Sequence, residues 1–223
     1  MPSEFYRVYD PFVALTAAAT ATSGLLVGTS VLLLPQRDAI QTAKAVASID
    51  QISAGRFLLG IGLGWNLEEA ADHGVASAMR GRLLDEKLAA MKELWANDQA
   101  EFHGRLIDFN PTFCWPKPVQ KPHPPIYLGG FTGTTVARAR RHGAGWMPLA
   151  AETPNMVSAQ MSLLDGATDV PVTVVVPGNA QPALLDAYCE HGVERAILTL
   201  PAEPESESLR RLDSLALLVD KVR

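Results

Sequence analysis

Gly129 and Gly130 are the residues of this sequence best placed to do chemistry, because they separate an apolar strand, expected at residues 126–128, from a helix expected at 136–142. Glycines let a ligand approach the backbone closely, and the first N–H groups of a helix, with its dipole, attract anions. The pattern therefore indicates a seat for the phosphate of a ligand. An ordinary strand-to-helix turn, in which the glycines only solve a backbone problem, explains the same residues equally well.

The elements that must position this turn alternate between strand and helix. The apolar run 25–34 lacks polar alternation, which indicates a strand covered on both faces, as in a parallel sheet. In the segment 79–97, Leu84, Leu88, Met91 and Trp95 fall on one helical stripe, which indicates a surface helix packed on a sheet. Six strands are expected, at 25–34, 56–61, 126–128, 145–149, 172–176 and 195–200, with helices at 10–23, 38–53, 79–97, 136–142, 155–164, 182–190 and 206–222.

This alternation fits either an open doubly wound sheet or a closed (β/α)8 barrel. Trp65 stands where the Rossmann fingerprint needs its third glycine, which favours the barrel. We therefore expect an α/β fold of the (β/α)8 TIM-barrel type, incomplete, with about six βα units present and about two missing before Met1. Residues 1–223 are expected to form a single barrel domain. Residues at about 98–124 are expected to form an excursion, a segment that leaves the alternating strands and helices of the barrel. It starts with a hairpin at 101–109, and the proline-rich residues 111–125 predict neither helix nor strand.

Composition excludes several classes of function. The chain has 223 residues, 48% of them hydrophobic and 19% charged, which is enough to bury one large core. A formal net charge of -5 leaves no basic surplus for binding nucleic acid. Cys114 and Cys189 lack partners at ligand spacing, so neither a disulfide framework nor a metal site is expected. The longest apolar run is too short to span a membrane and no secretory signal is present, which predicts a soluble cytoplasmic protein.

Eight short stretches carry a resemblance to a known family. They are YDPF (9–12), VGTSVLLLPQR (27–37), IDQISAGRF (49–57), GIGLGWN (60–66), DE (85–86), LW (94–95), PPIYLGG (124–130) and GAGW (143–146). Together they resemble the luciferase-like monooxygenase superfamily of flavin- and deazaflavin-dependent oxidoreductases, and most closely its actinobacterial branch assigned to coenzyme F420. The resemblance implies a (β/α)8 barrel that holds F420, or alternatively FMN, at the C-terminal ends of its strands.

The resemblance also implies which residues bind the cofactor. In relatives, a non-proline cis peptide bulges against the flavin ring, and the matching bond here is Ser30–Val31. Trp65 would either pack against the cofactor ring, as a wall of its site, or cover the hydrophobic core. Asn66 would either hydrogen-bond to the ligand or stabilise a turn. Thr132 adds a hydroxyl donor to the glycine pair. The implied cofactor-binding residues are Ser30, Val31, Gly62, Leu63, Gly64, Trp65, Asn66, Gly129, Gly130, Phe131 and Thr132.

No catalytic residue is assigned from the sequence. The histidines at positions 73, 103, 123, 142 and 191 show no partner spacing. Glu68 and Glu69 are interpreted as solvated loop carboxylates, and the charged residues at 80, 82, 85 and 86 as ion pairs on a helix face. In the family, groups near the reactive ring edge come from the two βα units that are absent before Met1. The proton donor is therefore expected outside this sequence.

The sequence thus predicts an oxidoreductase that uses F420 or FMN for hydride transfer or oxygenation of a small organic substrate. The alternative is a non-catalytic or truncated flavin-binding protein that retains only the phosphate site. A barrel enzyme that binds another phosphorylated substrate explains the glycine pair but none of the other stretches. Open strand edges predict a homo-oligomer, with neither nucleic acid nor membrane as a partner.

Overall fold

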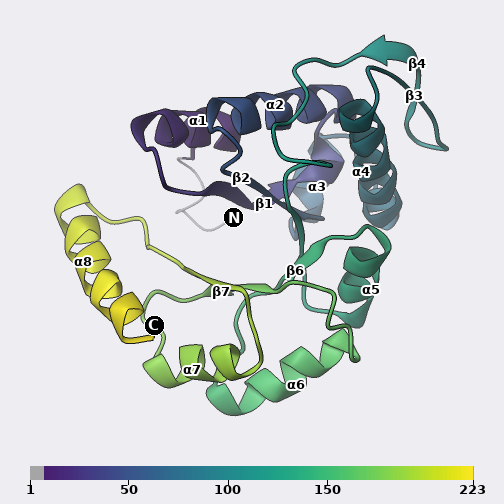
Figure 1. Cartoon of the computed structure of the whole chain (residues 1–223). Coiled ribbons are helices and arrows are strands. Elements are labelled where there is room, and N and C mark those ends of the chain that lie inside the picture. The colour runs from purple at the N-terminus through teal and green to yellow at the C-terminus, as the bar shows by residue number, and fades with distance from the viewer. Residues whose placement is uncertain (1–7, 223) are drawn as a thin grey trace. The chain divides into compact units, whose positions relative to one another are not determined.

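The computed structural model describes residues 8–222, with side chains through residue 217 (Figure 1). The chain divides into two compact units, one formed by residues 8–126 and the other by the described residues from Tyr127 onward. Strands alternate with helices in both units, as the sequence predicts. Within residues 8–222, no helix is both long and apolar enough to cross a membrane.

The unit of residues 8–126 contains a parallel strand pair and an antiparallel hairpin. Strands β1 and β2 pair in parallel, and β3 and β4 pair in antiparallel orientation. Two short 3-10 turns, η2 and η3, precede the second and fourth helices. The elements in chain order are α1 (Pro11–Ala21), β1 (Val27–Leu33), η2 (Leu34–Gln36), α2 (Ala39–Ile52), β2 (Phe57–Gly62), α3 (Leu67–Asp72), η3 (Ser77–Met79), α4 (Arg80–Ala96), β3 (Gln99–His103) and β4 (Asp108–Phe113).

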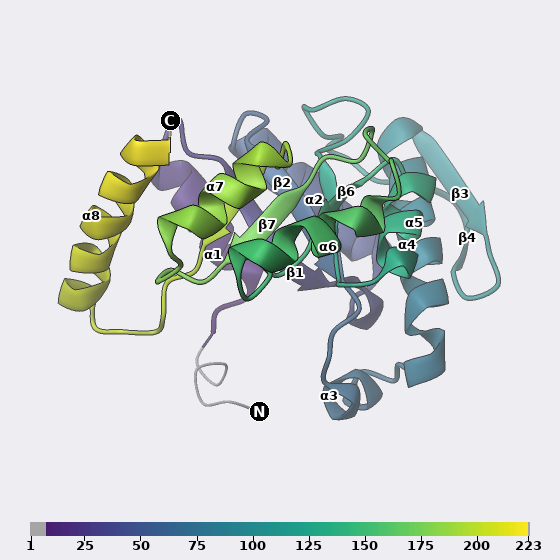
Figure 2. The same ribbon diagram turned by 90° about the horizontal axis from the view of Figure 1, so that it is seen from below.

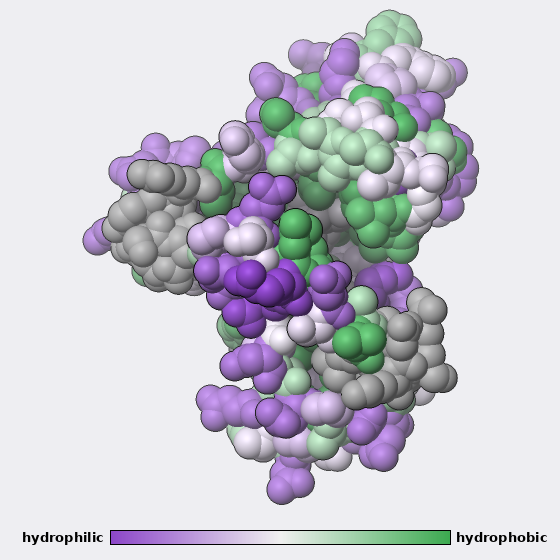
Figure 3. Space-filling view, turned by 90° about the vertical axis from the view of Figure 1, so that its left-hand side faces the viewer, coloured by the Kyte–Doolittle hydropathy of each residue, from purple (hydrophilic) through white to green (hydrophobic). Residues whose placement is uncertain are grey.

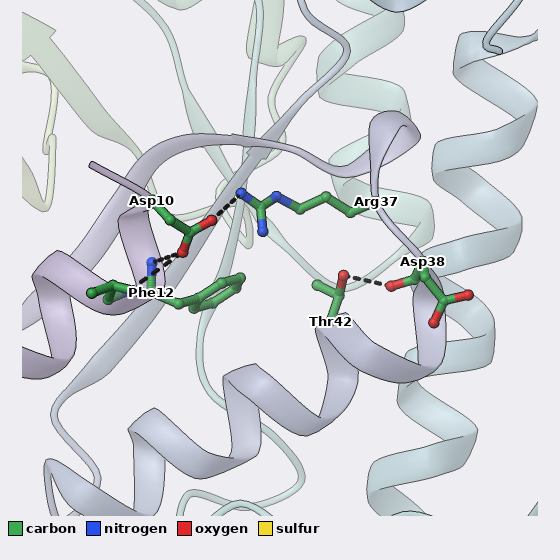
Figure 4. Close-up of polar contacts among 6 residues, drawn as sticks. Asp10, Phe12, Arg37, Asp38 and Thr42 are labelled. Carbon is green, nitrogen blue, oxygen red and sulfur yellow. Dashed lines mark hydrogen bonds and ion pairs between the residues drawn. The ribbon is translucent and has the colours of Figure 1, made fainter. Parts of the chain in front are cut away.

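Side-chain caps fix where α1 and α2 begin. Asp10 Oδ1 accepts a hydrogen bond of 2.9 Å from the Phe12 N–H, and Asp38 Oδ1 accepts one of 2.8 Å from the Gln41 N–H. A cap of this kind contributes about 1 kcal/mol by satisfying an N–H group that the helix leaves unpaired. Asp10 also pairs with Arg37 at 2.6 Å, so the start of α1 is tied to the turn that follows β1 (Figure 4). The predicted starts of both helices are confirmed.

The pair β1–β2 supplies buried apolar residues to this unit. Phe57, Leu59 and Ile61 of β2 are fully buried. Residues of β1 alternate between buried and exposed, with Gly28 and Ser30 exposed. The expectation that this strand is covered on both faces is therefore wrong. Glycine and serine hardly interrupt an apolar run, so the alternation is present in the structure but hidden in the hydropathy pattern.

The apolar stripe of α4 is buried, as its sequence predicts, although the helix packs chiefly against α2 and β3 rather than against the β1–β2 pair. Leu84, Leu88, Met91 and Trp95 are all buried. The indole Nε1 of Trp95 donates a hydrogen bond of 3.0 Å to the carbonyl oxygen of Ala43 in α2, so this large side chain is buried with its polar atom satisfied. Burial of each such side chain stabilises the unit by roughly 1.5–3 kcal/mol.

Two elements differ from the sequence prediction. Strand β4 runs through Pro111 to Phe113, although its proline content predicts neither helix nor strand. The β3–β4 pairing is irregular between Ala100 and Phe102, and Pro111 lies opposite this irregularity, where the ladder needs no N–H group. The short helix α3 lies inside residues 62–74, which the sequence predicts as a loop.

The unit that begins at Tyr127 is a run of parallel strands and helices. Strand β5 pairs with β6, and β7 pairs with β8. Bridges from Trp146 to Val172 and from Leu149 to Val175 connect the β6 segment to the β7 segment. Helices α6 and α7 lie along one side of β7 (Figures 1 and 2). The elements are β5 (Ile126–Gly129), α5 (Gly133–Arg141), β6 (Gly145–Met147), α6 (Val157–Met161), β7 (Thr173–Val176), α7 (Pro182–Glu190), β8 (Arg195–Leu198) and α8 (Glu205–Val222), with 3-10 turns η4 (Pro154–Met156) and η5 (Ser162–Leu164) beside α6.

Parallel strands that follow the chain order, each succeeded by a helix, are the pattern of a β/α barrel. Among the described residues the strands pair into open sheets and close no ring. The α/β class and the incomplete barrel are therefore confirmed. A single domain over the whole chain stays a prediction.

Apolar side chains reach the surface around α1. Tyr9, Val13, Leu25 and Leu26 are between 49% and 85% exposed. Helix α1 contains no charged residue, although a helix without a polar face is normally buried. Figure 3 shows the side of the molecule on the left of Figure 1, where apolar residues in green stand among hydrophilic ones in purple. The residues around α1 therefore form an exposed apolar surface.

Candidate functional site

The ends of β1 and β2 lie in close contact. The Ser30–Val31 peptide bond is cis, as the resemblance implies. The β1–β2 register shifts between Thr29 and Leu32, next to this bond. A Cβ atom on Gly62, at the end of β2, would lie 2.6 Å from Val31 Cγ2, so any larger residue at position 62 would have to displace the Val31 side chain.

The loop after β2 exposes an aromatic ring. Gly64 has a φ of +79°, which favours glycine, and its carbonyl oxygen accepts a hydrogen bond from the Arg80 guanidinium. Trp65 is 67% exposed within this structure. The interpretation of Trp65 as a cap on the core is therefore wrong for the described residues. Its role as a wall for a ligand ring stays a prediction.

Asn66 shapes the start of α3. Its Oδ1 accepts hydrogen bonds of 3.1 Å from the Glu68 N–H and 3.3 Å from the Glu69 N–H. The turn-shaping interpretation of Asn66 is confirmed, while a bond from Asn66 to a ligand stays a prediction. The two glutamates lie in the first turn of α3, where a carboxylate interacts favourably with the helix dipole.

The glycine pair lies between β5 and α5. Gly130 has a φ of +151°, and a Cβ atom there would lie 2.5 Å from Thr135 Oγ1. The carbonyl oxygen of Gly130 accepts a hydrogen bond of 2.8 Å from the indole Nε1 of the fully buried Trp146. The φ and the nearby Thr135 side chain favour glycine at this position, and the hydrogen bond from Trp146 holds its backbone in place.

Helix α5 begins earlier than the sequence predicts, at Gly133 rather than at Val136. Glycine and threonine are weak helix formers, so the first turn gives no helical signal in the sequence. Thr132 is the N-cap, and its hydroxyl lies 2.7 Å from Thr134 Oγ1 and 3.2 Å from Thr135 Oγ1. The helix therefore starts next to the glycine pair, with hydroxyl groups and N–H groups at the same turn.

The structure brings the sequence-predicted residues together in two separate groups. The first group, defined here as the β1–β2 group, lies in the unit of residues 8–126 and contains Ser30, Val31, Gly62, Leu63, Gly64, Trp65 and Asn66. The second, the glycine-pair group, lies in the other unit and contains Gly129, Gly130, Phe131 and Thr132. Phe131, like Trp65, carries an exposed ring, with 61% of its surface accessible.

Two charged residues have roles that the sequence analysis missed. Arg80, interpreted as a member of a helix-face ion pair, donates a hydrogen bond to the Gly64 carbonyl oxygen. Glu86 Oε2 accepts hydrogen bonds of 2.7 Å from the Leu106 N–H and 3.1 Å from the Ile107 N–H, which holds the tip of the β3–β4 hairpin. Both partners lie far away in sequence and are backbone groups, so no residue spacing indicates them.

The histidines show two different environments. The Asp108 carboxylate, 2.8 Å from His103 Nδ1 on the exposed hairpin, raises the pKa of His103 above its ordinary value. Burial lowers the pKa of His123, whose ring packs 5.6 Å from that of Trp95. Within residues 8–222, no cluster of histidine, cysteine and carboxylate side chains has the arrangement of a metal site.

Sequence comparison identifies related proteins along almost the whole chain. Residues 2–209 match the luciferase-like monooxygenase family. An uncharacterized protein of Mycobacterium tuberculosis is 32% identical over 222 residues, which covers 97% of this chain and 78% of that protein. The FMNH2-dependent dimethylsulfone monooxygenase of Pseudomonas putida is 36% identical over 117 residues, which covers 51% of this chain and 32% of that enzyme.

Solved structures share the fold at lower sequence identity. Monooxygenase RslO1 from Streptomyces bottropensis has a TM-score of 0.68 at 22% identity, covering 96% of this chain and 65% of that one. An F420-dependent secondary alcohol dehydrogenase in complex with an F420-acetone adduct has a TM-score of 0.67 at 16% identity, covering 93% and 76%. The chain thus spans just under two thirds of RslO1. Because the family match extends over most of its length, this chain belongs to the luciferase-like monooxygenase family.

Proposed function

We propose that this protein is an oxidoreductase that binds coenzyme F420, with FMN as the alternative, and acts on a small organic substrate by hydride transfer or oxygenation. Family membership supports the general class. The names of similar proteins mention both cofactors, since the Pseudomonas putida relative is FMNH2-dependent and a structural neighbour is F420-dependent. F420 is favoured on the resemblance of the sequence to the actinobacterial branch.

The conformation of Gly130 beside the start of α5 is the observation that carries the proposal. A phosphate group of the cofactor would lie at the start of α5, next to Gly129 and Gly130, and would accept hydrogen bonds from N–H groups of the first turn. The Thr132 hydroxyl adds a donor at the same turn. The hydrogen bond from Trp146 fixes the Gly130 carbonyl, so this turn needs little reorganisation on binding.

The β1–β2 group would contact the tricyclic ring. Ser30 and Val31 lie at the register shift of β1, and Gly62 packs directly against Val31. Trp65 offers an exposed indole surface on which a planar ring stacks. A bound flavin or deazaflavin supplies the redox chemistry, and these residues orient its ring and exclude water.

Titration of F420 and of FMN against the wild-type chain and Gly130→Val, followed by fluorescence, tests the proposal. The Cβ of valine would lie against Thr135 and at an unfavourable φ, so cofactor affinity should fall at least about ten-fold, or 1.4 kcal/mol. The matched control is Gly24→Val, because a Cβ on Gly24 meets no atom within 4 Å. Equal affinity in all three proteins, each shown to be folded by circular dichroism, would refute the phosphate assignment.

Turnover separates the enzyme from the alternative of a non-catalytic flavin-binding protein. Oxidised cofactor is mixed with candidate alcohols, which would donate a hydride to it, and reduced cofactor is mixed with candidate aldehydes and enones, which would accept one. The oxidation state of the cofactor is followed by absorbance. Substrate-dependent change of the cofactor supports the enzyme. Tight binding without any change supports the alternative.

A further inference from the structure

The chain that follows β6 lies beside the glycine pair. In the β5–β6 register, Gly129 is the direct partner of Met147, and neighbouring strands lie about 4.8 Å apart. The chain stays extended past Met147, because Leu149 forms a parallel bridge with β7. The turn at Gly130 and residues 149–151, defined here as the β6 end segment, therefore leave the same edge of the sheet next to each other.

Side chains of two helices hold the backbone of the β6 end segment. Tyr188 in α7 is buried, and its hydroxyl accepts a hydrogen bond of 2.6 Å from the Ala151 N–H. The same hydroxyl donates to Gln160 Oε1 in α6, and Gln160 Nε2 donates a hydrogen bond of 2.8 Å to the Leu149 carbonyl oxygen. Burial raises the pKa of Tyr188 above its ordinary value, so the phenol keeps its proton at neutral pH. One tyrosine and one glutamine thus fix both ends of the segment.

Strand β7 holds the residues in between. The Ala150 N–H donates a hydrogen bond of 2.8 Å to the Val175 carbonyl oxygen, and the Val175 N–H donates one of 2.9 Å to the Pro148 carbonyl oxygen. These backbone groups are all bonded inside the protein. What the segment offers a ligand is therefore chiefly a side chain.

That side chain is Leu149, which is 54% exposed. The register with β7 does not shift over residues 146–149, so side chains continue to alternate between the two faces of the sheet. Leu149 consequently shares a face with Met147, and through Met147 with Gly129. Phe131, directly after the glycine pair, is 61% exposed. The glycine turn is thus accompanied by an exposed apolar side chain from each of two neighbouring strand ends.

We propose that Tyr188 and Gln160 are positioning residues of the cofactor site, which hold the β6 end segment so that the Leu149 side chain packs against the cofactor bound at the glycine pair. The inference rests on the proposed function, because the ligand concerned is the F420 or FMN of that proposal. Both residues act through the backbone of residues 149–151 and not by touching the cofactor. Apolar contact with Leu149 adds affinity, and a segment that is already held in place loses little freedom on binding.

Fluorescence titration of F420 and FMN against the full chain and its variants tests the proposal. Leu149→Ala removes the apolar contact, so cofactor affinity should fall about ten-fold, or 1.4 kcal/mol. Tyr188→Phe keeps the ring and removes the hydroxyl that holds the segment. Affinity should then fall about five-fold, the equivalent of one hydrogen bond.

The double variant gives a reading that a purely structural role of Tyr188 would not give. If Tyr188 acts through the position of Leu149, its hydroxyl has nothing left to position once the leucine side chain is removed. The two changes together should then cost about ten-fold in cofactor affinity, whereas independent effects would multiply to about fifty-fold.

Two control variants match these changes. Tyr127 is also buried, and its hydroxyl donates a hydrogen bond of 2.8 Å to Glu194 Oε2, but it lies near the start of β5 and not at the carboxyl end. Tyr127→Phe and Tyr188→Phe should both lower the urea midpoint, and only Tyr188→Phe should weaken cofactor binding. Leu209→Ala changes a leucine that is also 54% exposed, on α8, and should leave affinity unchanged.

The outcomes separate this inference from the proposed function. Unchanged cofactor affinity in Tyr188→Phe or in Leu149→Ala overturns the positioning role while the proposed function stands. A fifty-fold loss in the double variant, or an equal loss in Tyr127→Phe, also overturns it. If neither F420 nor FMN binds the wild-type chain, the proposed function fails and the positioning role fails with it.

Discussion

The indole N–H of Trp146 donates a hydrogen bond of 2.8 Å to the carbonyl oxygen of Gly130, so a buried side chain of β6 holds the turn that leads into α5. Trp146→Phe removes this bond while keeping an aromatic ring in the core. We expect a loss of about 1–3 kcal/mol in the free energy of unfolding, because the half-buried carbonyl loses its partner. Cofactor affinity should also fall, because the hydrogen bond that holds the Gly130 backbone of the glycine-pair group is lost.

Trp95→Phe is the matched control for that change. Trp95 is also buried and also donates its indole N–H to a backbone carbonyl, that of Ala43, at 3.0 Å. Both variants should lose similar stability in urea unfolding, whereas only Trp146→Phe should weaken cofactor binding. Equal effects of the two variants on cofactor affinity would contradict a specific role for Trp146.

A second prediction concerns Asp50, which is completely buried in α2. Its carboxylate accepts hydrogen bonds of 3.0 Å from the Gln120 N–H and 2.6 Å from Gln120 Nε2, and so ties the excursion to the helix. Asp50→Asn replaces one acceptor by a donor that faces these N–H groups. Urea unfolding should show a loss of about 1.5–3 kcal/mol, the range for hydrogen bonds to a charged group. Asp98→Asn, at an exposed position, should stay within about 0.5 kcal/mol of wild type.

The pH dependence of the hairpin is a third prediction. The hydrogen bond to Asp108 raises the pKa of His103 in the folded state. The interaction is therefore fully present below the ordinary histidine pKa of about 6.5 and is lost as the pH rises through the raised value. NMR titration of the imidazole should give a pKa above that of an unperturbed histidine. In Asp108→Asn the pKa should move down, and an identical titration curve in both proteins would count against the pairing.

Self-association is a fourth prediction. Helix α1 has no charged residue, and Leu25, between α1 and β1, is 58% exposed, so we expect a homo-oligomer at micromolar concentration. Leu25→Lys should lower the molar mass measured by light scattering. Leu209→Lys, which changes a leucine of similar exposure (54%) on α8, should leave it unchanged. A wild-type monomer would remove the basis for the prediction.

Local signals explain what the sequence could predict. The cap at Asp10 and the apolar stripe of α4 depend on neighbouring residues, so their spacing is visible in the chain. The cis bond at Ser30–Val31 came from resemblance, because no local rule indicates a cis peptide before a residue other than proline.

Long-range contacts explain what the sequence could not predict. The partners of Arg80 and Glu86 are backbone groups of other segments. The early start of α5 at Gly133 lies in residues with weak helix propensity.

Glu86 and Lys87 are neighbours in α4 and hold two different segments against this helix. Glu86 binds the hairpin tip, and Lys87 binds the turn that follows β1. One helix therefore fixes the position of both segments, so a displacement of α4 would move the hairpin and the turn together.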